Sequence, residues 1–157
     1  MRVGIGYDIH SLVEDRPLML GGIEIPHIKG LQGHSDGDAL IHAICDAILG
    51  AAGLEDIGHQ FPDNDDRYAG VSGVELLKKV RDLISKKRFK VDYIDSVVIL
   101  EEPRIGPFKK DMAERIAASL GIDSDNVSVK AKTQEGIGAL GRGEAAAAYA
   151  VTSLKKI

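Results

Sequence analysis

Three polar side chains lie at spacings that suit a metal ion. Residues 2–12 have the sequence RVGIGYDIHSL, an alternating pattern that predicts a strand. Side chains two apart on a strand point the same way, so the carboxylate of Asp8 and the imidazole of His10 project together. His42 adds a second imidazole from a predicted helix. Two histidines and one carboxylate leave one position of a tetrahedral, zinc-like ion open.

Each of these residues also has a purely structural interpretation. Asp8 and His10 could form a solvent-facing polar pair on an edge strand, and His42 could be a partly buried histidine that binds no ion. The metal prediction therefore depends on whether the strand and the helix bring all three side chains together.

The helix that carries His42 is predicted over residues 36–52. Its apolar residues recur every three or four positions, Ser35 or Asp36 can cap its first turn, and Gly53 suits a left-handed stop. The free N–H groups at a helix start favour an anion such as phosphate. Polar residues that a plain core helix does not need gather near this start: His34, Ser35, Asp38 and His42. We therefore expect a functional site at this end of the helix.

The remaining segments alternate between strand and helix patterns. Residues 54–68 are polar and acidic, lack a period, and predict a long loop, a kind of segment that is more often functional than idle. The glycines of residues 136–143 argue against a helix there, and residues 145–154 (AAAAYAVTSL) fit either a helix or a closely packed strand. The other predictions are two short strands within 17–29, helices at 72–87 and 107–120, and strands at 91–100 and 127–133. This alternation predicts an α/β (α+β) sandwich, a mixed β-sheet covered by helices.

Composition limits the classes of protein to which the chain can belong. Its 157 residues are 44% hydrophobic and 28% charged, which predicts a single domain over residues 1–157 with a sizeable core. The net charge of −4 gives no basic surface for nucleic acid. No apolar segment is long enough for a membrane span and no leader precedes the first strand, so we expect a cytoplasmic protein without membrane partners. Cys45 is the single cysteine, so it forms no internal disulfide.

Four motifs give the chain a close resemblance to a known enzyme family. They are G-Y-D-x-H-S, G-H-S-D-G-D-x-x-x-H, D-I-G-x-x-F-P-D and K-x-K-T-x-E-x-x-G-x-x-G-R-G-E, in this order and over essentially the full length. With them the chain resembles the 2-C-methyl-D-erythritol 2,4-cyclodiphosphate synthases of the non-mevalonate isoprenoid pathway. The resemblance implies a homotrimer with active sites between neighbouring subunits. It also implies conversion of 4-diphosphocytidyl-2-C-methyl-D-erythritol 2-phosphate to 2-C-methyl-D-erythritol 2,4-cyclodiphosphate, with release of CMP.

The resemblance also implies roles for the metals and the reacting groups. The two histidines and the carboxylate described above would hold zinc, and a substrate phosphate oxygen would take its open position. Glu135 would hold a second divalent ion, magnesium or manganese, on the diphosphate. His34 and Thr133 would stabilise the transition state of an intramolecular phosphoryl transfer, in which positioning and charge neutralisation supply most of the catalysis.

Further residues would bind the two parts of the substrate. The resemblance implies that the phosphates and the methylerythritol contact Ser35, Asp56, Ile57, Gly58, Phe61, Pro62, Asp63, Asn64, Asp65 and Arg142. It implies that the nucleotide contacts Leu100, Glu101, Glu102, Pro103, Arg104, Ile105 and Gly106, largely through backbone groups. The neighbouring subunit would complete the nucleotide side with Lys132, Thr133, Gln134 and Glu135.

Two residues depart from the family pattern. Ala139 stands where the family commonly has phenylalanine at the border of the active site and of a hydrophobic passage along the trimer axis. Tyr7 stands where phenylalanine is frequent. Both changes alter the surface that would hold an isoprenoid diphosphate along the axis, and neither touches the predicted metal ligands.

Two other classes of function are compatible with a zinc-like site. One is a nucleotide- or polyphosphate-binding trimer without turnover, and the other is a zinc-dependent hydrolase in which the open position carries an activated water. A hydrolase needs a base beside that water, whereas the matched pattern supplies phosphate-binding residues. A pure binder has no need to combine His34, Thr133 and Glu135. Synthesis of the cyclic diphosphate is therefore the favoured prediction.

Overall fold

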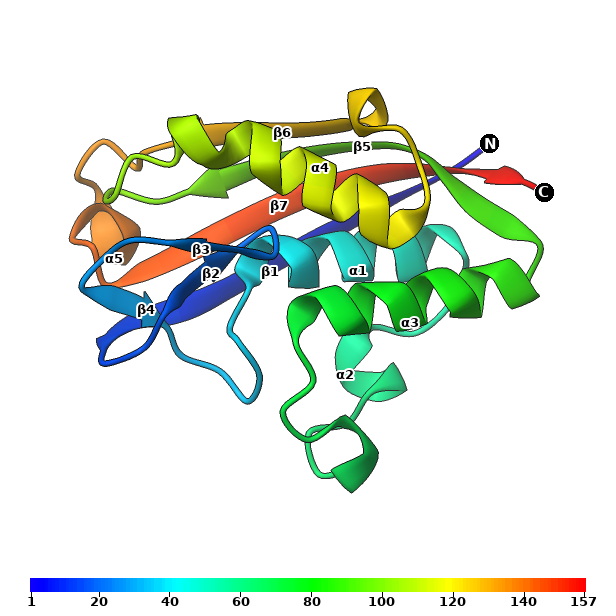
Figure 1. Ribbon diagram of the computed structural model, residues 1–157, viewed down its shortest axis with the longest axis horizontal. Coiled ribbons are helices and arrows are strands. Elements are labelled where there is room, and N and C mark those ends of the chain that lie inside the picture. The colour runs from blue at the N-terminus through cyan, green and yellow to red at the C-terminus, as the bar shows by residue number, and fades with distance from the viewer.

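The computed structural model describes every residue from Met1 to Ile157 and consists of one layer of helices on one main sheet (Figure 1). The strands are β1 (Arg2–Glu14), β2 (Leu18–Leu20), β3 (Ile23–Ile25), β4 (Lys29–Leu31), β5 (Phe89–Ile99), β6 (Val127–Lys132) and β7 (Ala145–Lys156). The α-helices are α1 (Ala39–Ala51), α2 (Ile57–Gln60), α3 (Gly73–Lys86), α4 (Lys109–Leu120) and α5 (Gly138–Gly141). Three short 3₁₀ helices complete the set, η1 (Asp66–Tyr68), η2 (Gly106–Phe108) and η3 (Ser124–Asn126).

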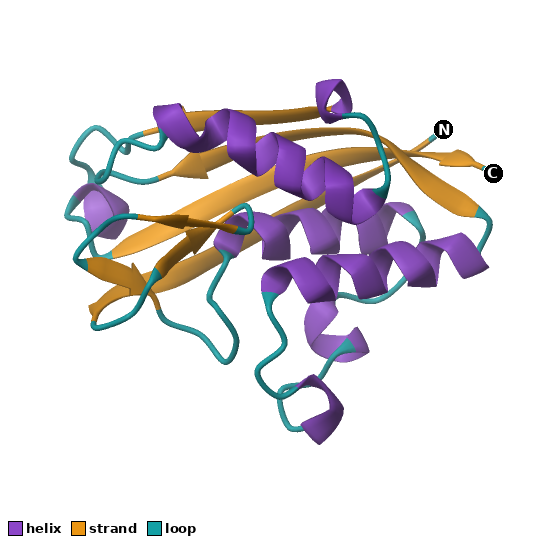
Figure 2. Cartoon of the chain, in the orientation of Figure 1, coloured by secondary structure: helices purple, strands orange, loops and turns teal.

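The main sheet has five strands in the order β4-β1-β7-β5-β6. Only β5 and β6 run parallel, and the other neighbours are antiparallel, so the sheet is mixed as predicted. Strands β2 and β3 form a separate hairpin. Helices α1, α3 and α4 lie over the same face of the sheet (Figure 2). The prediction of a mixed sheet covered by helices is thus confirmed, with the cover on one face only. None of the helices has the length and apolar content that crossing a bilayer requires.

Helix α1 packs closely on the sheet because small residues meet at the contact. A Cβ atom at Gly6 would lie 1.8 Å from the carbonyl oxygen of Ala43, and one at Gly4 would lie 2.0 Å from that of Ala47. The ambiguous segment 145–154 forms most of strand β7 despite the helical propensity of alanine, because it pairs with β1 on one side and with β5 on the other. Buried residues at alternate positions of β7 are Ala146, Ala148 and Ala150.

The opposite face of the sheet is apolar and uncovered in the single chain. Its exposed large side chains are Val3, Ile5, Tyr7 and Ile9 of β1, Tyr149 and Val151 of β7, and Tyr93 of β5. Each of them is 43–71% exposed, and the rings of Tyr7 and Tyr149 lie 4.8 Å apart. A contiguous apolar patch of this kind on a folded chain usually marks a protein–protein interface.

The start of α1 differs from the prediction. The helix begins at Ala39 rather than at residue 36, because Gly37 has a φ of 69° and so departs from helical geometry. Its N-cap is Asp38, and the predicted caps Ser35 and Asp36 lie in the preceding loop. The left-handed glycine at the far end, Gly53 with φ of 69°, is as predicted.

Asp38 is a structural residue rather than part of the predicted site. Its fully buried carboxylate accepts the N–H of Ile41 at 3.0 Å in the first turn of α1. The same carboxylate accepts the N–H groups of Gly21 and Gly22 at 3.0 and 2.7 Å. It therefore joins the β2–β3 hairpin to the helix start, and it is absent from the cavity described below.

Replacing this carboxylate should destabilise the chain without removing a contact to a ligand. Asp38→Ala leaves three N–H groups without acceptors, two of them buried, so we expect a loss of at least about 3 kcal/mol in the free energy of unfolding. Asp38→Asn keeps one acceptor oxygen and should lose less. Urea unfolding at one fixed protein concentration measures both. A change within error of zero for Asp38→Ala would contradict the structural role.

Three other segments also depart from the predictions. The predicted loop 54–68 contains α2 and η1, because Asp56 and Asp65 cap them with side-chain hydrogen bonds. The glycine-rich segment forms the single turn α5, although Gly138 at its first position has φ of 70°. The helix expected from residue 107 begins at Lys109, after η2.

Candidate functional site

The three predicted metal ligands converge between β1 and α1. Asp8 Oδ2 lies 2.7 Å from His10 Nε2 and 3.2 Å from His42 Nδ1, and the two nitrogens are 3.3 Å apart. Ligands about 2.0 Å from a tetrahedral ion are themselves about 3.3 Å apart, so the set fits a zinc-sized ion after a small expansion. His42 is nearly buried, while Asp8 and His10 are partly exposed toward solvent.

The surroundings orient both rings for ligation. His10 Nδ1 donates to the carbonyl oxygen of Gln32 at 2.6 Å, so Nε2 is the nitrogen that carries the lone pair for a metal ion when the ring is neutral. His42 presents Nδ1 to Asp8, and its Nε2 lies 3.5 Å from Ser35 Oγ on the other side of the ring. Neutral imidazole nitrogens with one carboxylate are the donor set of an open zinc site.

The same contacts shift the acid–base properties of the ligands. Burial raises the pKa of Asp8, but hydrogen bonds from His10 and His42 outweigh it and lower the pKa to about 2. The hydrogen bond to Asp8 raises the pKa of His10 above 6.5, against an opposing effect of burial. Without a metal, the carboxylate therefore stays ionised and the neighbouring imidazole holds a proton more firmly than usual.

Metal should reverse the pH dependence of stability at this site. In the metal-free chain, Asp8 contributes to the free energy of unfolding above pH 3.8, and this contribution is lost as pH falls toward about 2. The contribution of His10 is fully present below pH 6.5 and is lost as pH rises through the raised pKa of its imidazole. A metal ion competes with the proton and binds more tightly as pH rises. We therefore expect the increase in Tm on adding Zn²⁺ to grow from about pH 6 to about pH 8, while the metal-free Tm declines. An increase in Tm that is independent of pH would contradict this coupling.

A cavity of about 580 Å³ opens beside the ligands. His34 and Asp63 approach each other across its mouth, with His34 Nε2 3.5 Å from Asp63 Oδ2, and both side chains are mostly exposed. The cavity is lined by Asp8, His10, Gly33, His34, Ser35, His42, Ile57, Gly58, Phe61, Pro62, Asp63, Tyr68, Ala69, Gly70, Val71 and Leu76. An anionic group inside it would meet both the metal ligands and His34.

The predicted contacts from residues 56–65 divide into two groups. The first group lines the cavity and consists of Ile57, Gly58, Phe61, Pro62 and Asp63. Three others do not line it: Asp56, Asn64 and Asp65. The carboxylate of Asp56 is used at the start of α2, where it accepts the N–H of His59 at 2.9 Å, and Asp65 pairs with Arg67 at 2.6 Å.

The nucleotide residues predicted at 100–106 and 132–135 meet each other but not this cavity. Leu100 donates its N–H to the carbonyl oxygen of Lys132 at 2.9 Å, and Gln134 donates its N–H to the carboxylate of Glu101 at 2.5 Å. Neither segment contributes to the lining of the cavity. Leu100 and Ile105 are buried, so only their backbone groups remain for a ligand. The single chain thus holds two separate halves of the predicted site.

The segment after β6 carries the other residues that are predicted to bind phosphate or metal. Thr133 and Glu135 are exposed, and Glu135 has a φ of 55° with its N–H donated to Thr133 Oγ1 at 3.2 Å. Arg142 pairs with Glu144 at 3.2 Å, which raises the pKa of the arginine. Ala139, which differs from the family pattern, is exposed on α5.

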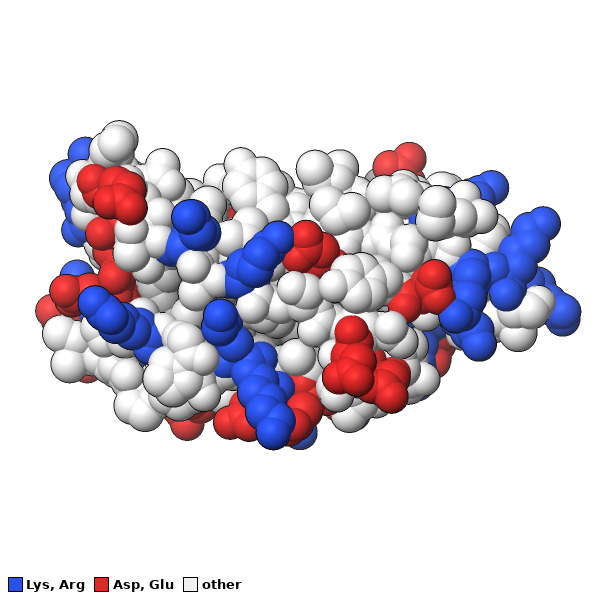
Figure 3. Space-filling model, turned by 90° about the horizontal axis from the view of Figure 1, so that it is seen from above, with Lys and Arg blue, Asp and Glu red and all other residues white.

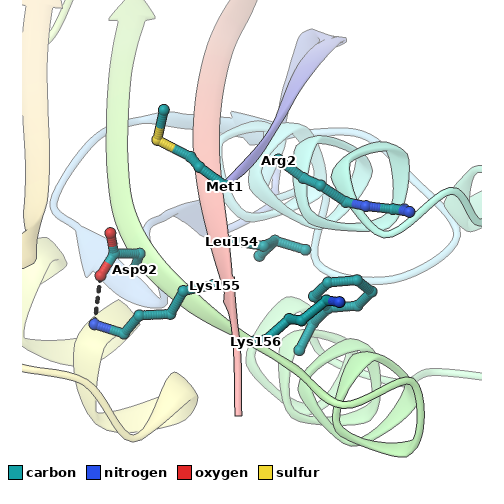
Figure 4. Close-up of a pocket in the computed structure, with 7 residues that line it drawn as sticks. Met1, Arg2, Asp92, Leu154, Lys155 and Lys156 are labelled. Carbon is teal, nitrogen blue, oxygen red and sulfur yellow. Dashed lines mark hydrogen bonds and ion pairs between the residues drawn. The ribbon is translucent and has the colours of Figure 1, made fainter.

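A second cavity of about 540 Å³ lies at the end of the sheet where the two termini meet. Basic side chains gather at this end (Figure 3). They do not converge on one point, because Lys155 pairs with Asp92 on one side of β7 while Arg2 lies on the other side (Figure 4). Arg2 instead stacks over the ring of Phe89 at 4.9 Å.

Sequence reasoning missed part of the cavity wall and also a residue of α1, outside the lining, that supports this wall. Tyr68 packs edge-on against Phe61 with ring centroids 5.0 Å apart, and both line the cavity. Asp46, one turn after His42 on α1, accepts the N–H of Ile57 at 2.9 Å and so fixes the start of α2. The helical spacing of His42 and Asp46 is a signal in the sequence, whereas no local signal identifies Tyr68.

Comparisons with known proteins identify the family of the chain. A family model described as the YgbB family matches residues 1–155. The chain belongs to the YgbB family. A relative from Pelotomaculum thermopropionicum, named 2-C-methyl-D-erythritol 2,4-cyclodiphosphate synthase, is 55% identical over 156 residues, which are 99% of this chain and 96% of the relative.

Solved structures of similar proteins share the fold. A 2C-methyl-D-erythritol-2,4-cyclodiphosphate synthase in a CDP-bound form has a TM-score of 0.91 and 36% identity, over 98% of this chain and 100% of the other. The bifunctional IspDF of Campylobacter jejuni has a TM-score of 0.95 and 41% identity, and the match covers 99% of this chain and 42% of the longer one. The resemblance inferred from the four motifs is confirmed, and in this YgbB member the metal triad and the cavity lie within the matched region.

Proposed function

We propose that the chain converts 4-diphosphocytidyl-2-C-methyl-D-erythritol 2-phosphate to 2-C-methyl-D-erythritol 2,4-cyclodiphosphate and releases CMP, as a cyclising phosphorus–oxygen lyase. The observation that carries this proposal is the triad Asp8, His10 and His42 at the wall of a 580 Å³ cavity, in a chain whose family includes synthases of this name. In this reaction an oxygen of the 2-phosphate attacks the β-phosphorus, and the bond from that phosphorus to the CMP oxygen breaks. The substrate is a soluble phosphorylated compound, which is consistent with a cytoplasmic enzyme.

The proposed role of the chain is to hold a crowded set of phosphate oxygens. Asp8, His10 and His42 would hold a divalent ion, zinc by the chemistry of the donors, which would supply Lewis acidity to the phosphates. His34 and Ser35 lie beside this triad and donate hydrogen bonds to further oxygens. The cavity wall at residues 57–63 holds the methylerythritol part, so that the 2-phosphate folds back toward the diphosphate.

The nucleotide half of the proposed site comes from a second copy of the chain. Residues 100–106 and 132–135 form one connected surface, but they do not line the cavity of their own chain. The uncovered apolar face of the sheet gives a surface on which copies associate, and a cyclic homotrimer places the two halves of neighbouring copies together. In this arrangement Thr133 would stabilise the transition state, and Glu135 would hold magnesium or manganese, whose charge would neutralise phosphate oxygens.

Phosphorus NMR of the reaction tests the proposed function. The expected result is a cyclic diphosphate together with CMP, lost on chelation and restored by added Zn²⁺ and Mg²⁺. CMP beside a linear phosphate product would instead indicate a zinc-dependent hydrolase. Binding of CDP without any turnover, in a metal-loaded trimer, would indicate a binding protein. Either of these outcomes contradicts the synthase.

A further inference from the structure

The loop that carries His34 is held by a guanidinium from outside the cavity. Arg16 follows β1, and its two terminal nitrogens donate to the carbonyl oxygens of Gly33 at 3.2 Å and Ser35 at 2.7 Å. The two acceptors are the residues on either side of His34. Arg16 therefore fixes the backbone at both neighbours of the histidine, with the bidentate geometry that only arginine provides.

The surrounding backbone is built to keep Arg16 close to this loop. Asp15 has a φ of 60° and turns the chain at the end of β1. A Cβ at Gly30 would lie 2.3 Å from the carbonyl oxygen of Arg16, so the absence of a side chain there lets β4 approach the arginine. The preceding residue of the loop, Gln32, is fixed in turn, because its carbonyl oxygen accepts from His10 and its N–H donates to the carbonyl oxygen of Ser11 at 2.9 Å.

Arg16 is costly for the fold, which argues against a role in stability alone. Its Nε is buried and has no hydrogen-bond partner, and the side chain forms no ion pair with any carboxylate of the chain. An unpaired buried donor on an uncompensated charge lowers stability. The same positive charge, next to a cavity for an anionic substrate, favours binding.

We propose that Arg16 is a positioning residue for the reaction: it fixes His34 and Ser35 through the carbonyl groups of residues 33 and 35, and it adds an uncompensated positive charge behind the phosphate site. This inference rests on the proposed function, because it assigns the effect of Arg16 to phosphate groups bound by His34 and Ser35. The substrate that this role of Arg16 requires is therefore a phosphorylated anion.

Substitutions of Arg16 separate geometry from charge. In Arg16→Ala the loop is free, and we expect kcat to fall about 10- to 100-fold, with a higher KM and with the metal content of the wild type. Arg16→Lys keeps the charge but satisfies one carbonyl at most, so KM should return toward the wild-type value while kcat stays low. Millimolar guanidinium should restore part of the kcat of Arg16→Ala and none of that of Arg16→Lys.

Arg81→Ala is the matched control. Arg81 also donates to a backbone carbonyl, that of Ser119 at 3.0 Å, but it joins α3 to α4 outside the cavity. We expect this variant to lower Tm and leave kcat unchanged. Wild-type kcat in Arg16→Ala, or a loss of metal in parallel with activity, would overturn the proposal.

Nuclear magnetic relaxation of the backbone amides tests the inference independently of turnover. The order parameters of residues 33–35 should fall in Arg16→Ala from the values of a rigid backbone to those of a flexible loop, and should stay unchanged in Arg81→Ala. Unchanged order parameters at 33–35 in Arg16→Ala would overturn the proposed role of Arg16. If the wild type released no CMP, the proposed function would fail, while this measurement would still decide whether Arg16 fixes the loop.

Discussion

We expect His42→Ala to lose its bound metal and more than about 100-fold of its activity while the chain stays folded. Losing a residue that merely supports a metal ligand costs about 10- to 100-fold, so losing a ligand itself should exceed that range. His42 supplies one of three donors, and the remaining carboxylate and imidazole form a poor site for a tetrahedral ion. Metal content by mass spectrometry and CMP release by phosphorus NMR measure the two effects together.

The stability of this variant has to be compared with that of the metal-free wild type. His42 is only 8% exposed on α1, so its truncation also leaves a small gap in the packing. The matched control is His27→Ala, which removes a histidine between β3 and β4, away from the cavity. Metal content and turnover equal to the wild type in His42→Ala would rule out the metal assignment. Loss of fold in both the variant and the metal-free wild type would show that the ion is needed for structure.

The metal triad could be predicted because part of its geometry is set by the two-residue repeat of a β-strand. Asp8 and His10 share a face since a strand repeats every two residues, and this holds in any sheet. Their meeting with His42 depends on how closely α1 packs on β1, which follows from Gly4 and Gly6 in the strand. These glycines are visible in the sequence, but the residue that packs against each one is not.

The errors at the same site have long-range causes. Asp38 was predicted within the site because it is one of the polar residues gathered near the helix start, yet its carboxylate accepts from Gly21 and Gly22 of a distant hairpin. Arg16 gave no signal, because its partners are backbone carbonyls of residues 33 and 35 and carbonyls carry no sequence identity. The alanine-rich strand was ambiguous because intrinsic propensity favours helix, whereas its pairing with β1 and β5, which are distant in the sequence, selects strand.

The division of the proposed site into two halves is the feature that no local pattern contains. The motif around Thr133 and the motif around His42 lie in the same chain, but in the fold the first follows β6 and the second lies in α1. If neighbouring copies complete one another, loss of activity in one half can be compensated by an intact half from another copy. A monomeric site does not have this property, so mixing inactive variants distinguishes the two arrangements.

Mixed trimers of His42→Ala and Thr133→Ala should regain activity that neither variant has alone. Thr133→Ala should lose about 100-fold by itself, as expected for one group that stabilises the transition state. In trimers assembled at random from equal amounts, about a quarter of the interfaces pair an intact metal half with an intact nucleotide half, if the interface is the head-to-tail kind of a cyclic trimer. The turnover of the mixture should therefore approach about a quarter of the wild-type value.

The double variant His42→Ala/Thr133→Ala makes this experiment decisive. Mixed with His42→Ala it offers no intact metal half, so this pair should stay inactive although it exchanges subunits in the same way. Differently tagged copies, purified through both tags after joint refolding, establish that the trimers are mixed. Activity in the first mixture but not in the second requires that a metal half and a nucleotide half from different copies form one site. Inactivity in both, with mixed trimers demonstrated, would place the whole site within one chain and require the segments at 100–106 and 132–135 to move toward their own cavity.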